Sequence, residues 1–329
     1  FRIALSGLKN TIIGGFEIAE IIGKQEVLNR LQFSINILKS KDVVGVFQLE
    51  SSGMSNVIQN LRTSNLNDII SALALYRPGP MEIIPTFIKR KFKEEIVTYP
   101  HNDLKEILEE TYGTIVYQEQ IMQIAVKFAG YTLGRADILR RAVSKKKKEV
   151  LEEERKSFVV SSINNGYSKE VAENIYDYIV KFADYGFNKA HSVAYAKLAY
   201  QTAYLKCHYP TYYMSTLMTS FLGSSNDISN YYKEALRKNI PVYSPNINQS
   251  MQYFTSTNGG IMFPLTAVKG LGEVKARDLI AERLKGKFES FKDFVIRTKN
   301  IIPLVVSIIL VIWFALGIFP IKPVAIASG

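Results

Sequence analysis

Cysteine and histidine are scarce in this sequence of 329 residues. Cys207 is the only cysteine, so the chain can form neither an internal disulfide framework nor a cysteine-based metal cluster. The histidines His101, His191 and His208 lie far apart or lack the spacing of metal ligands. The composition therefore excludes a disulfide-stabilised domain and does not favour a zinc module.

Charged residues are absent from a long stretch near the C-terminus. No residue from Asn300 to Ile321 is charged, and the run 301–319 is almost wholly apolar, with Lys299 and Lys322 on either side. A helix of 19 residues, rising about 1.5 Å each, approaches the ~30 Å thickness of a bilayer core. The length favours a transmembrane helix, and a buried core helix is the alternative.

Acidic residues are outnumbered by basic ones. The chain has 41 Lys and Arg against 30 Asp and Glu, which gives a formal charge of +11 and a pI near 9.4. Such an excess favours polyanionic partners, such as nucleic acid, nucleotides or an anionic membrane surface. It says nothing about the fold.

Six positive charges are concentrated in the nine residues 140–148. In a helix, Arg141, Lys145 and Lys148 would lie on one face, at spacings of four and three. Guanidinium groups bind phosphate through paired hydrogen bonds, and lysine acts as a mobile point charge. A solvated charged surface is the alternative, but the compensating acids come only at 149 and 152–154. The pattern favours a phosphate-binding patch.

Apolar residues recur with a helical period through most of the chain, which predicts a mainly α fold. A helix at 66–76 is stopped by the rigid turn at 77–80, whose two prolines cannot continue it. The segment 43–49 resembles a strand and leads into a helix after Ser51, while Asn258-Gly259-Gly260 predicts a hairpin. Helices are also predicted at 103–111, 117–129, 135–158, 168–183, 189–207 and 228–238.

Five segments of the chain match motifs of a known family. They are 45–51 (GVFQLES), 74–81 (ALYRPGPM), 112–120 (YGTIVYQEQ), 136–148 (ADILRRAVSKKKK) and 185–206, which begins YGFNKAHS. In this order they resemble the C-family replicative DNA polymerases, the family of the bacterial DNA polymerase III alpha subunit. The resemblance covers roughly residues 1–298.

This resemblance implies a mainly α architecture of helical polymerase fingers with a small β-hairpin and a helix-hairpin-helix element. The sequence adds one C-terminal hydrophobic helix. The implied domains are a palm remnant at 1–40, the fingers at 41–222, a helix-hairpin-helix DNA-binding region at 223–298, and a hydrophobic, transmembrane-candidate tail at 299–329.

The resemblance also implies a site for the incoming deoxynucleoside triphosphate. In phosphoryl transfer the protein mainly positions and neutralises phosphate charge, so a set of cations suits the task. The cations that would grip the triphosphate are Arg77, Arg140, Arg141, Lys145 and Lys189.

Two aromatic residues would complete this site. His191 and Tyr195 are four residues apart and share a helical face on which a base or sugar could pack, with ordinary core packing as the equal alternative. Tyr117, Gln118 and Gln120 are likewise balanced between template contact and structural hydrogen bonding.

A glycine turn at 268–276 resembles the hairpin of a helix-hairpin-helix motif. Gly270 and Gly272 would let the backbone approach a duplex, so that amide groups donate to a phosphate, while Lys269 and Lys275 add charge. Such binding is independent of sequence and sensitive to salt. A plain turn at a helix start is the alternative.

No catalytic residue is assigned. The family uses three palm aspartates to hold two metal ions, of which two would lie upstream of Phe1 and the third falls at Ala4. Alanine cannot ligate magnesium, so we expect Mg²⁺ only in the intact enzyme and none bound by this chain. The chain alone should not polymerise DNA.

The resemblance implies part of a replicative polymerase that binds deoxynucleoside triphosphate and primer-template DNA, with sliding clamp, clamp loader and exonuclease as partners and a cytoplasmic location. The alternative is a non-catalytic DNA-binding fragment, tethered to a membrane through 301–319. Residues 319–329 resemble the segment after the membrane helix of type I signal peptidases. The start at Phe1 indicates a fragment, and a frameshift, fusion, chimera or real anchor would explain the junction near Asn300.

Overall fold

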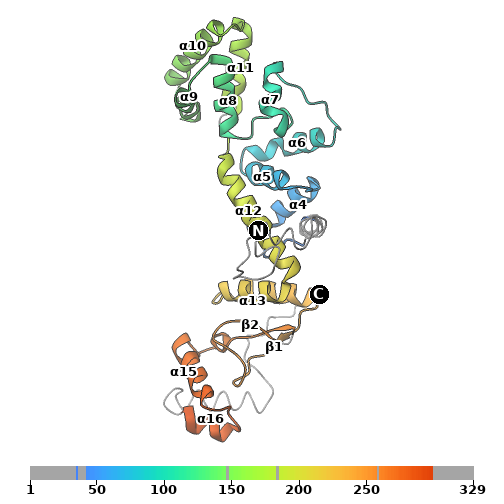
Figure 1. Cartoon of the computed structure of the whole chain (residues 1–329), viewed down its shortest axis with the longest axis vertical. Coiled ribbons are helices and arrows are strands. Elements are labelled where there is room, and N and C mark those ends of the chain that lie inside the picture. The colour runs from blue at the N-terminus through green and yellow to red at the C-terminus, as the bar shows by residue number, and fades with distance from the viewer. Residues whose placement is uncertain (1–34, 36–41, 146–147, 183–184, 258, 299–329) are drawn as a thin grey trace, which may run out of the picture. The chain divides into compact units, whose positions relative to one another are not determined.

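The computed structural model describes residues 35, 42–145, 148–182, 185–257 and 259–298. The chain divides into unit 1, Phe1–Ala203, and unit 2, Tyr204–Gly329, and each is described by itself (Figure 1). Helices predominate in the described part, which confirms the mainly α prediction. The domain boundaries proposed at 40, 222 and 298 stay predictions.

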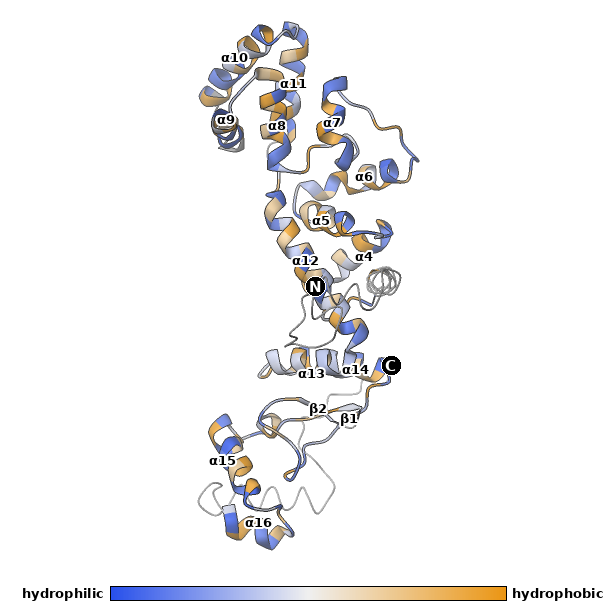
Figure 2. Ribbon diagram, viewed as in Figure 1, coloured by the Kyte–Doolittle hydropathy of each residue, from blue (hydrophilic) through white to orange (hydrophobic). Residues whose placement is uncertain are grey.

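The first core of unit 1 lies between α4 (Ser52–Asn60), α5 (Leu66–Leu75), α6 (Ile84–Lys91) and the unit 1 part of α12 (Lys189–His208). Helix α4 begins where predicted, because the hydroxyl of Ser51 accepts a backbone N–H of the first turn at 3.3 Å. Figure 2 shows hydrophilic and hydrophobic residues along these helices; α4 buries Met54, Val57 and Ile58 on one face, whereas most of α5 is buried.

A second core of unit 1 lies within a group of helices that pack together (Figure 1). Its largest buried side chains include Phe128, Phe158 and Tyr176. His101 packs edge-on against Phe128 and Tyr167, at 5.5 and 5.6 Å between ring centroids, so it serves this aromatic cluster. The helices are α7 (Lys105–Leu108), α8 (Gln118–Ala129), α9 (Leu133–Lys145), α10 (Lys148–Asn164) and α11 (Lys169–Phe182).

The single helix predicted at 135–158 is wrong, because the chain reverses between α9 and α10. A carboxylate oxygen of Glu154 lies 2.7 Å from the Arg135 guanidinium, and the hydroxyls of Tyr131 and Ser157 are 3.0 Å apart. Nineteen residues of straight helix would separate Arg135 from Glu154 by about 28 Å. Charged residues run through this segment, and no glycine or proline there indicates a turn.

Two further local predictions fail. Segment 43–49 forms turns rather than a strand: the N–H groups of Val46 and Leu49 donate to the carbonyls three residues earlier at 2.9 and 3.0 Å. Val43, Val46 and Leu49 are all buried, a period of three that was misread as strand-like. The helix predicted at 103–111 is reduced to α7 between the 3₁₀ turns Asn102–Leu104 and Glu109–Thr111.

Unit 2 contains α13 (Pro210–Ser220), α14 (Ser225–Arg237) and a sheet of three short strands. Strand β2 (Thr255–Thr257) pairs antiparallel with β3 (Gly260–Met262), which confirms the predicted hairpin. The strand β1 (Val242–Tyr243), which was not predicted, pairs parallel with β3, so the order is β1-β3-β2.

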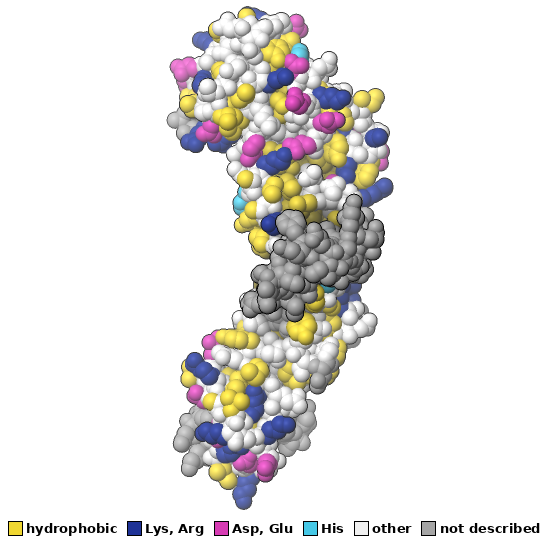
Figure 3. Space-filling model, in the orientation of Figure 1, with side chains coloured by type: hydrophobic (Ala, Val, Ile, Leu, Met, Phe, Trp, Pro, Cys, Tyr) yellow, Lys and Arg dark blue, Asp and Glu magenta, His cyan; other side chains and the backbone are white. Residues whose placement is uncertain are grey.

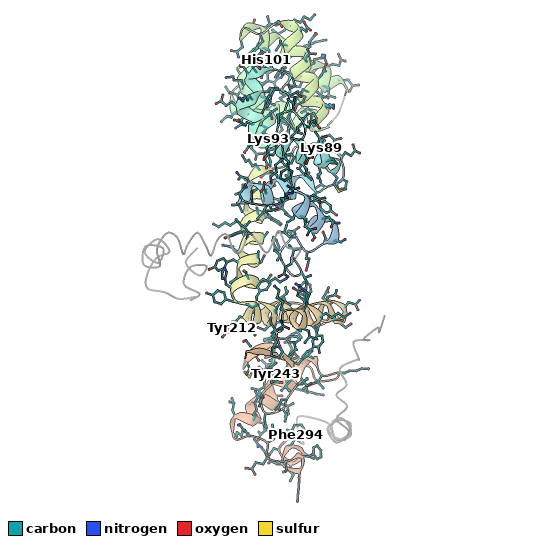
Figure 4. The ribbon with its side chains drawn as sticks, turned by 90° about the vertical axis from the view of Figure 1, so that its right-hand side faces the viewer. Lys89, Lys93, His101, Tyr212, Tyr243 and Phe294 are labelled. Carbon is teal, nitrogen blue, oxygen red and sulfur yellow. The ribbon has the colours of Figure 1, made fainter. Side chains whose placement is uncertain are left out.

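The rest of unit 2 is a small helical core. Helices α15 (Glu273–Leu284) and α16 (Phe291–Thr298) pack around Phe288 and Phe294, whose ring centroids are 5.2 Å apart (Figure 4). Arg297 donates to the carbonyls of Glu282 and Gly286 at 2.6 and 2.9 Å. These bonds fix the connection between the two helices.

Within the described ranges, no helix combines the length and apolarity needed to cross a membrane. The transmembrane prediction at 301–319 and the signal-peptidase resemblance at 319–329 both lie outside these ranges.

Candidate functional site

A cavity of about 270 Å³ opens in unit 1 beside the start of α12. Its wall is formed by the turn before α4, the end of α5 and the first turns of α12. Three of the residues predicted to bind nucleotide contribute to it. The lining residues are Gln48, Ser51, Met54, Leu73, Tyr76, Arg77, Phe187, His191, Ser192 and Tyr195.

Aromatic rings form one side of this cavity. His191 and Tyr195 lie one helical turn apart on α12, with ring centroids 4.0 Å apart and planes inclined by 33°. Phe187 meets His191 edge-on at 5.4 Å, and Phe47 lies 5.3 Å from Tyr195. The predicted shared face is confirmed, and His191 is exposed rather than packed in the core. Such a surface suits stacking against a planar base.

Arg77 is fixed at the edge of the same cavity. Its Nε donates to the carbonyl of Ala74 and its Nη2 to that of Tyr185, both at 2.8 Å, while the guanidinium carbon lies 4.3 Å from the Phe187 ring centroid. Burial lowers the pKa of Arg77, but a guanidinium remains charged at neutral pH. The sequence therefore places a permanent cation beside the aromatic rings.

A short parallel bridge brings the starts of α8 and α12 together. Phe187 N–H donates to the carbonyl of Val116, and Gln118 N–H donates to that of Phe187, both at 2.9 Å. Gly186 makes the approach possible, because a Cβ there would lie 3.2 Å from the side chain of Gln118. Residues about 70 positions apart in sequence thus share one backbone connection.

Arg140 reaches this bridge from α9. Its Nη1 donates to the side-chain oxygen of Gln118 at 3.1 Å, and its Nε and Nη2 donate to Asp137 Oδ1 at 2.9 and 2.7 Å. Arg141 contacts the other Asp137 oxygen at 2.8 Å, but its side chain is 67% exposed. Hydrogen bonding from Arg140 lowers the pKa of Asp137, so this carboxylate is charged and counters both arginines.

Lys189 lies near the same bridge, at the first residue of α12. Its ammonium is 2.7 Å from both Glu110 oxygens and 5.2 Å from the ring centroid of Tyr117. Its backbone N–H donates to both oxygens of Glu119 at 3.0 Å, placing a carboxylate at the helix N-terminus. Basic and acidic side chains are likewise interspersed on the face of unit 1 shown in Figure 3.

The predicted comb of Arg141, Lys145 and Lys148 is not formed on one helix. Lys145 is the last residue of α9, whereas Lys148 is the first residue of α10, after the reversal. The side chains of these two lysines lie outside the described part of the chain. Arg77, His191 and Tyr195 meet in the cavity, while Arg140 and Lys189 are attached to the bridge next to it.

The structure favours structural roles for two residues left open by the sequence. Gln120 is buried; its side chain accepts the N–H groups of Val116 and Tyr117 at 2.9 and 3.0 Å and donates to Thr111 at 2.9 Å. The Tyr117 hydroxyl lies 3.3 Å from that of Ser71, and burial raises its pKa to about 12. Gln118, which is half-buried, orients Arg140.

Sequence reasoning missed four residues of this region. The counter-ion Glu110 lies outside the family motifs, and Asp137 lies within the motif 136–148 but was assigned no role, although acids near predicted phosphate ligands were the available clue. Gln48, at a positive φ of 62°, and the buried Ser192 also line the cavity.

In unit 2 the glycine turn leads directly into α15. Gly270 has a φ of +86°, which only glycine adopts easily, and Leu271 N–H donates to the carbonyl of Val268 at 3.0 Å. Among the residues that the structure describes, none lies within 4 Å of a Cβ placed at Gly270 or Gly272, and Lys269 is exposed. Lys275 is half-buried. The backbone of the turn is therefore open to a partner.

Replacing Gly53 with alanine tests the wall of the cavity. The added Cβ would lie 1.7 Å from the Tyr76 hydroxyl oxygen, so we expect a loss of about 1–3 kcal/mol in the free energy of unfolding. Urea denaturation measures this. Gly134→Ala in α9 is the matched control: a Cβ there has no described neighbour within 4 Å, so the free energy of unfolding should rise by up to ~1 kcal/mol. Equal stabilities for both variants would contradict the crowding.

Comparison with known proteins agrees with these elements. Residues 29–166 match the bacterial DNA polymerase III alpha subunit finger domain, and residues 239–309 match a helix-hairpin-helix motif. An anticodon binding domain family matches residues 1–35, of which only Ile35 is described.

Individual relatives are similar over most of the chain. The DNA polymerase III subunit alpha of Bacillus subtilis is 47% identical over 267 residues, 81% of this chain and 24% of the relative. That of Staphylococcus epidermidis is 44% identical over 260 residues, 79% of this chain and 24% of the relative. The chain thus spans about a quarter of the length of these relatives. It is therefore homologous to part of the bacterial DNA polymerase III alpha subunit, over a stretch with its finger domain and a helix-hairpin-helix motif.

Proposed function

We propose that this part of a replicative polymerase binds the incoming deoxynucleoside triphosphate in unit 1 and primer-template DNA through unit 2. The observation that carries the nucleotide role is the cavity lined by Arg77, His191 and Tyr195. Arg140 and Lys189 contact residues at the backbone bridge next to this cavity. Rings for the nucleoside and cations for the phosphates are thus present in one region of one unit.

The hydrogen bonds that these cations make to carboxylates could equally be made to a phosphate. Arg140 and Lys189 each engage a carboxylate with two short hydrogen bonds, and a phosphate oxygen can take the same donors. In our proposal the triphosphate replaces Glu110 and Asp137 as their partner. Arg141 would assist from the exposed side, and Lys145 stays a predicted member of the set.

The chemical step requires residues that the described part does not provide. No group of three His, Cys, Asp or Glu residues arranged to bind a metal ion occurs within the described ranges, and Ala4 lies outside them. We propose that in the intact enzyme palm carboxylates would hold Mg²⁺, which would supply charge stabilisation when the primer 3′-hydroxyl bonds to the α-phosphate and pyrophosphate leaves. Unit 1 supplies binding and orientation.

Equilibrium titration of the chain with each deoxynucleoside triphosphate tests the nucleotide role. Binding that weakens with added salt, and that exceeds the binding of the corresponding nucleoside, supports it. Absence of binding to all four triphosphates would contradict the proposal.

The second candidate function is DNA binding without catalysis, which the open glycine turn before α15 favours. Replacing both Lys269 and Lys275 with alanine should reduce the slope of log affinity against log salt by about one unit for each lost phosphate contact. Fluorescence anisotropy of a labelled primer-template measures this slope. Lys127→Ala with Lys169→Ala, both exposed lysines of unit 1, removes the same charge as a control. If the salt dependence of DNA affinity were unchanged in the variant lacking Lys269 and Lys275, the glycine turn would have only a structural role.

The remaining partners are proposals from homology. We propose a cytoplasmic protein that works with a sliding clamp, clamp loader and exonuclease in the intact replicase. A membrane tether through 301–319 stays a prediction from the sequence alone.

A further inference from the structure

Ser192 is a buried hydroxyl in the first turns of α12. Its side chain is fully buried, and among the residues that the structure describes its Oγ has no hydrogen-bond partner. The backbone N–H donates normally to the carbonyl of Asn188 at 3.2 Å, so the helix itself is intact. Buried hydroxyls are almost always paired, because leaving one unpaired is unfavourable. The Ser192 hydroxyl is therefore a candidate to hydrogen-bond a bound ligand.

The position of Ser192 indicates where that partner lies. Ser192 lines the cavity next to His191 and is accompanied there by the polar side chain of Gln48. Gln48 adopts a φ of 62°, a conformation that is uncommon for residues other than glycine. The rest of the lining includes aromatic and apolar side chains, with Tyr195 and Met54 among them.

This combination suits a nucleoside better than a phosphate chain. Planar rings stack on aromatic side chains, and the edge of a base or sugar offers polar atoms for a hydroxyl. The cavity of about 270 Å³ lies just below the usual range for ligand sites, and of the predicted triphosphate cations with described side chains Arg77 lines it, whereas Arg140, Arg141 and Lys189 do not. The cavity therefore fits one end of the triphosphate, with its anionic end outside.

We infer that Ser192 is a binding residue that hydrogen-bonds the nucleoside part of the triphosphate through Oγ and positions it on the His191–Tyr195 surface. The inference rests on the proposed nucleotide function and adds a ligand-contacting residue to it. The hydroxyl stays unpaired in the free protein and gains its partner only with ligand, so it contributes to affinity rather than to stability.

Ser192→Ala separates these two contributions. The variant should bind deoxynucleoside triphosphates about three- to tenfold more weakly, the effect of one neutral hydrogen bond, while its affinity for inorganic tripolyphosphate is unchanged. Its thermal unfolding midpoint should equal or exceed that of the unsubstituted chain, because an unpaired buried hydroxyl is removed. Titrations of the 329-residue chain with dATP, dCTP, dGTP, dTTP and tripolyphosphate supply the affinities.

Ser162 provides a matched control. It is also fully buried, its hydroxyl also lacks a partner within the described ranges, and it belongs to α10, away from the lining of the cavity. Ser162→Ala should show the same gain or constancy in unfolding midpoint and no change in nucleotide affinity. A loss of triphosphate affinity in both variants would overturn the inference.

The outcomes also separate this inference from the function on which it rests. If the unsubstituted chain binds triphosphates and Ser192→Ala binds them equally well, only the inference fails. If the unsubstituted chain binds neither triphosphates nor tripolyphosphate, the proposed function fails and the inference with it. Unequal losses among the four triphosphates would indicate a contact with the base, and equal losses a contact with the sugar.

Discussion

Replacing Arg140 and Lys189 together with alanine is expected to reduce the affinity for deoxynucleoside triphosphate by about 3–6 kcal/mol. Each residue presents a charged donor on one side of the Tyr117–Phe187 bridge, and a hydrogen bond to a charged group contributes about 1.5–3 kcal/mol. The loss corresponds to at least a hundredfold change in the dissociation constant. Titration calorimetry of the chain with and without the substitutions measures it.

The control for this double variant keeps the charge change and moves it elsewhere. Arg155 on α10 pairs with Asp177 and its side chain is 38% exposed, and Lys169 on α11 lies near Glu173 and its side chain is 72% exposed. Replacing this pair with alanine should leave triphosphate affinity unchanged within about 0.5 kcal/mol. Arg141→Ala should have a smaller effect than Arg140→Ala, because the Arg141 side chain is 67% exposed. If both double variants lost the same triphosphate affinity, the binding would depend on overall charge and not on a specific site at Arg140 and Lys189.

Replacing Lys206 with methionine is expected to lower the free energy of unfolding by about 3–5 kcal/mol. The lysine side chain is fully buried in unit 2, and its ammonium lies 2.7 Å from Glu234, whose side chain is 4% exposed. Arg237 contacts the same carboxylate at 2.8 Å. Without Lys206 a buried charge loses its closest buried partner, which costs far more than a surface ion pair contributes.

Urea denaturation of three variants distinguishes this explanation from a loss of packing. Lys285→Met removes a pair with Glu282 whose lysine is 73% exposed, and should cost less than ~1 kcal/mol. Lys206→Met combined with Glu234→Leu removes both buried charges and should recover most of the loss. If the double variant is as unstable as Lys206→Met, the ion pair is not the cause.

Much of the helical architecture follows from apolar periodicity. Helices α5, α8, α11 and α12 occur within a few residues of their predictions, which rested on apolar residues recurring at helical intervals. The reversal between α9 and α10 did not follow, since charged residues run through it without a glycine or proline. The parallel pairing of β1 with β3 depends on distant residues that local patterns do not report.

The sequence predicted several of the residues that line the candidate site, but not how the fold brings them together. The motifs pointed to Arg77, His191 and Tyr195, and the structure places all three in one cavity. Their proximity depends on the backbone bridge at Phe187, which no spacing rule encodes. Asp137 and Glu110 were missed because a sequence shows total charge but not which acid reaches which base.

Glu110 and Asp137 also have a thermodynamic consequence. In the proposed function, a triphosphate bound by Lys189 and Arg140 would replace these carboxylates, so the two cations would exchange one anion for another instead of acquiring their first. The attraction between the triphosphate and the two cations would then be partly offset by the loss of their ion pairs with Glu110 and Asp137. A weak or singly charged competitor gains little from such an exchange, whereas a densely charged one gains much, and this difference favours whole nucleotides over stray cellular anions.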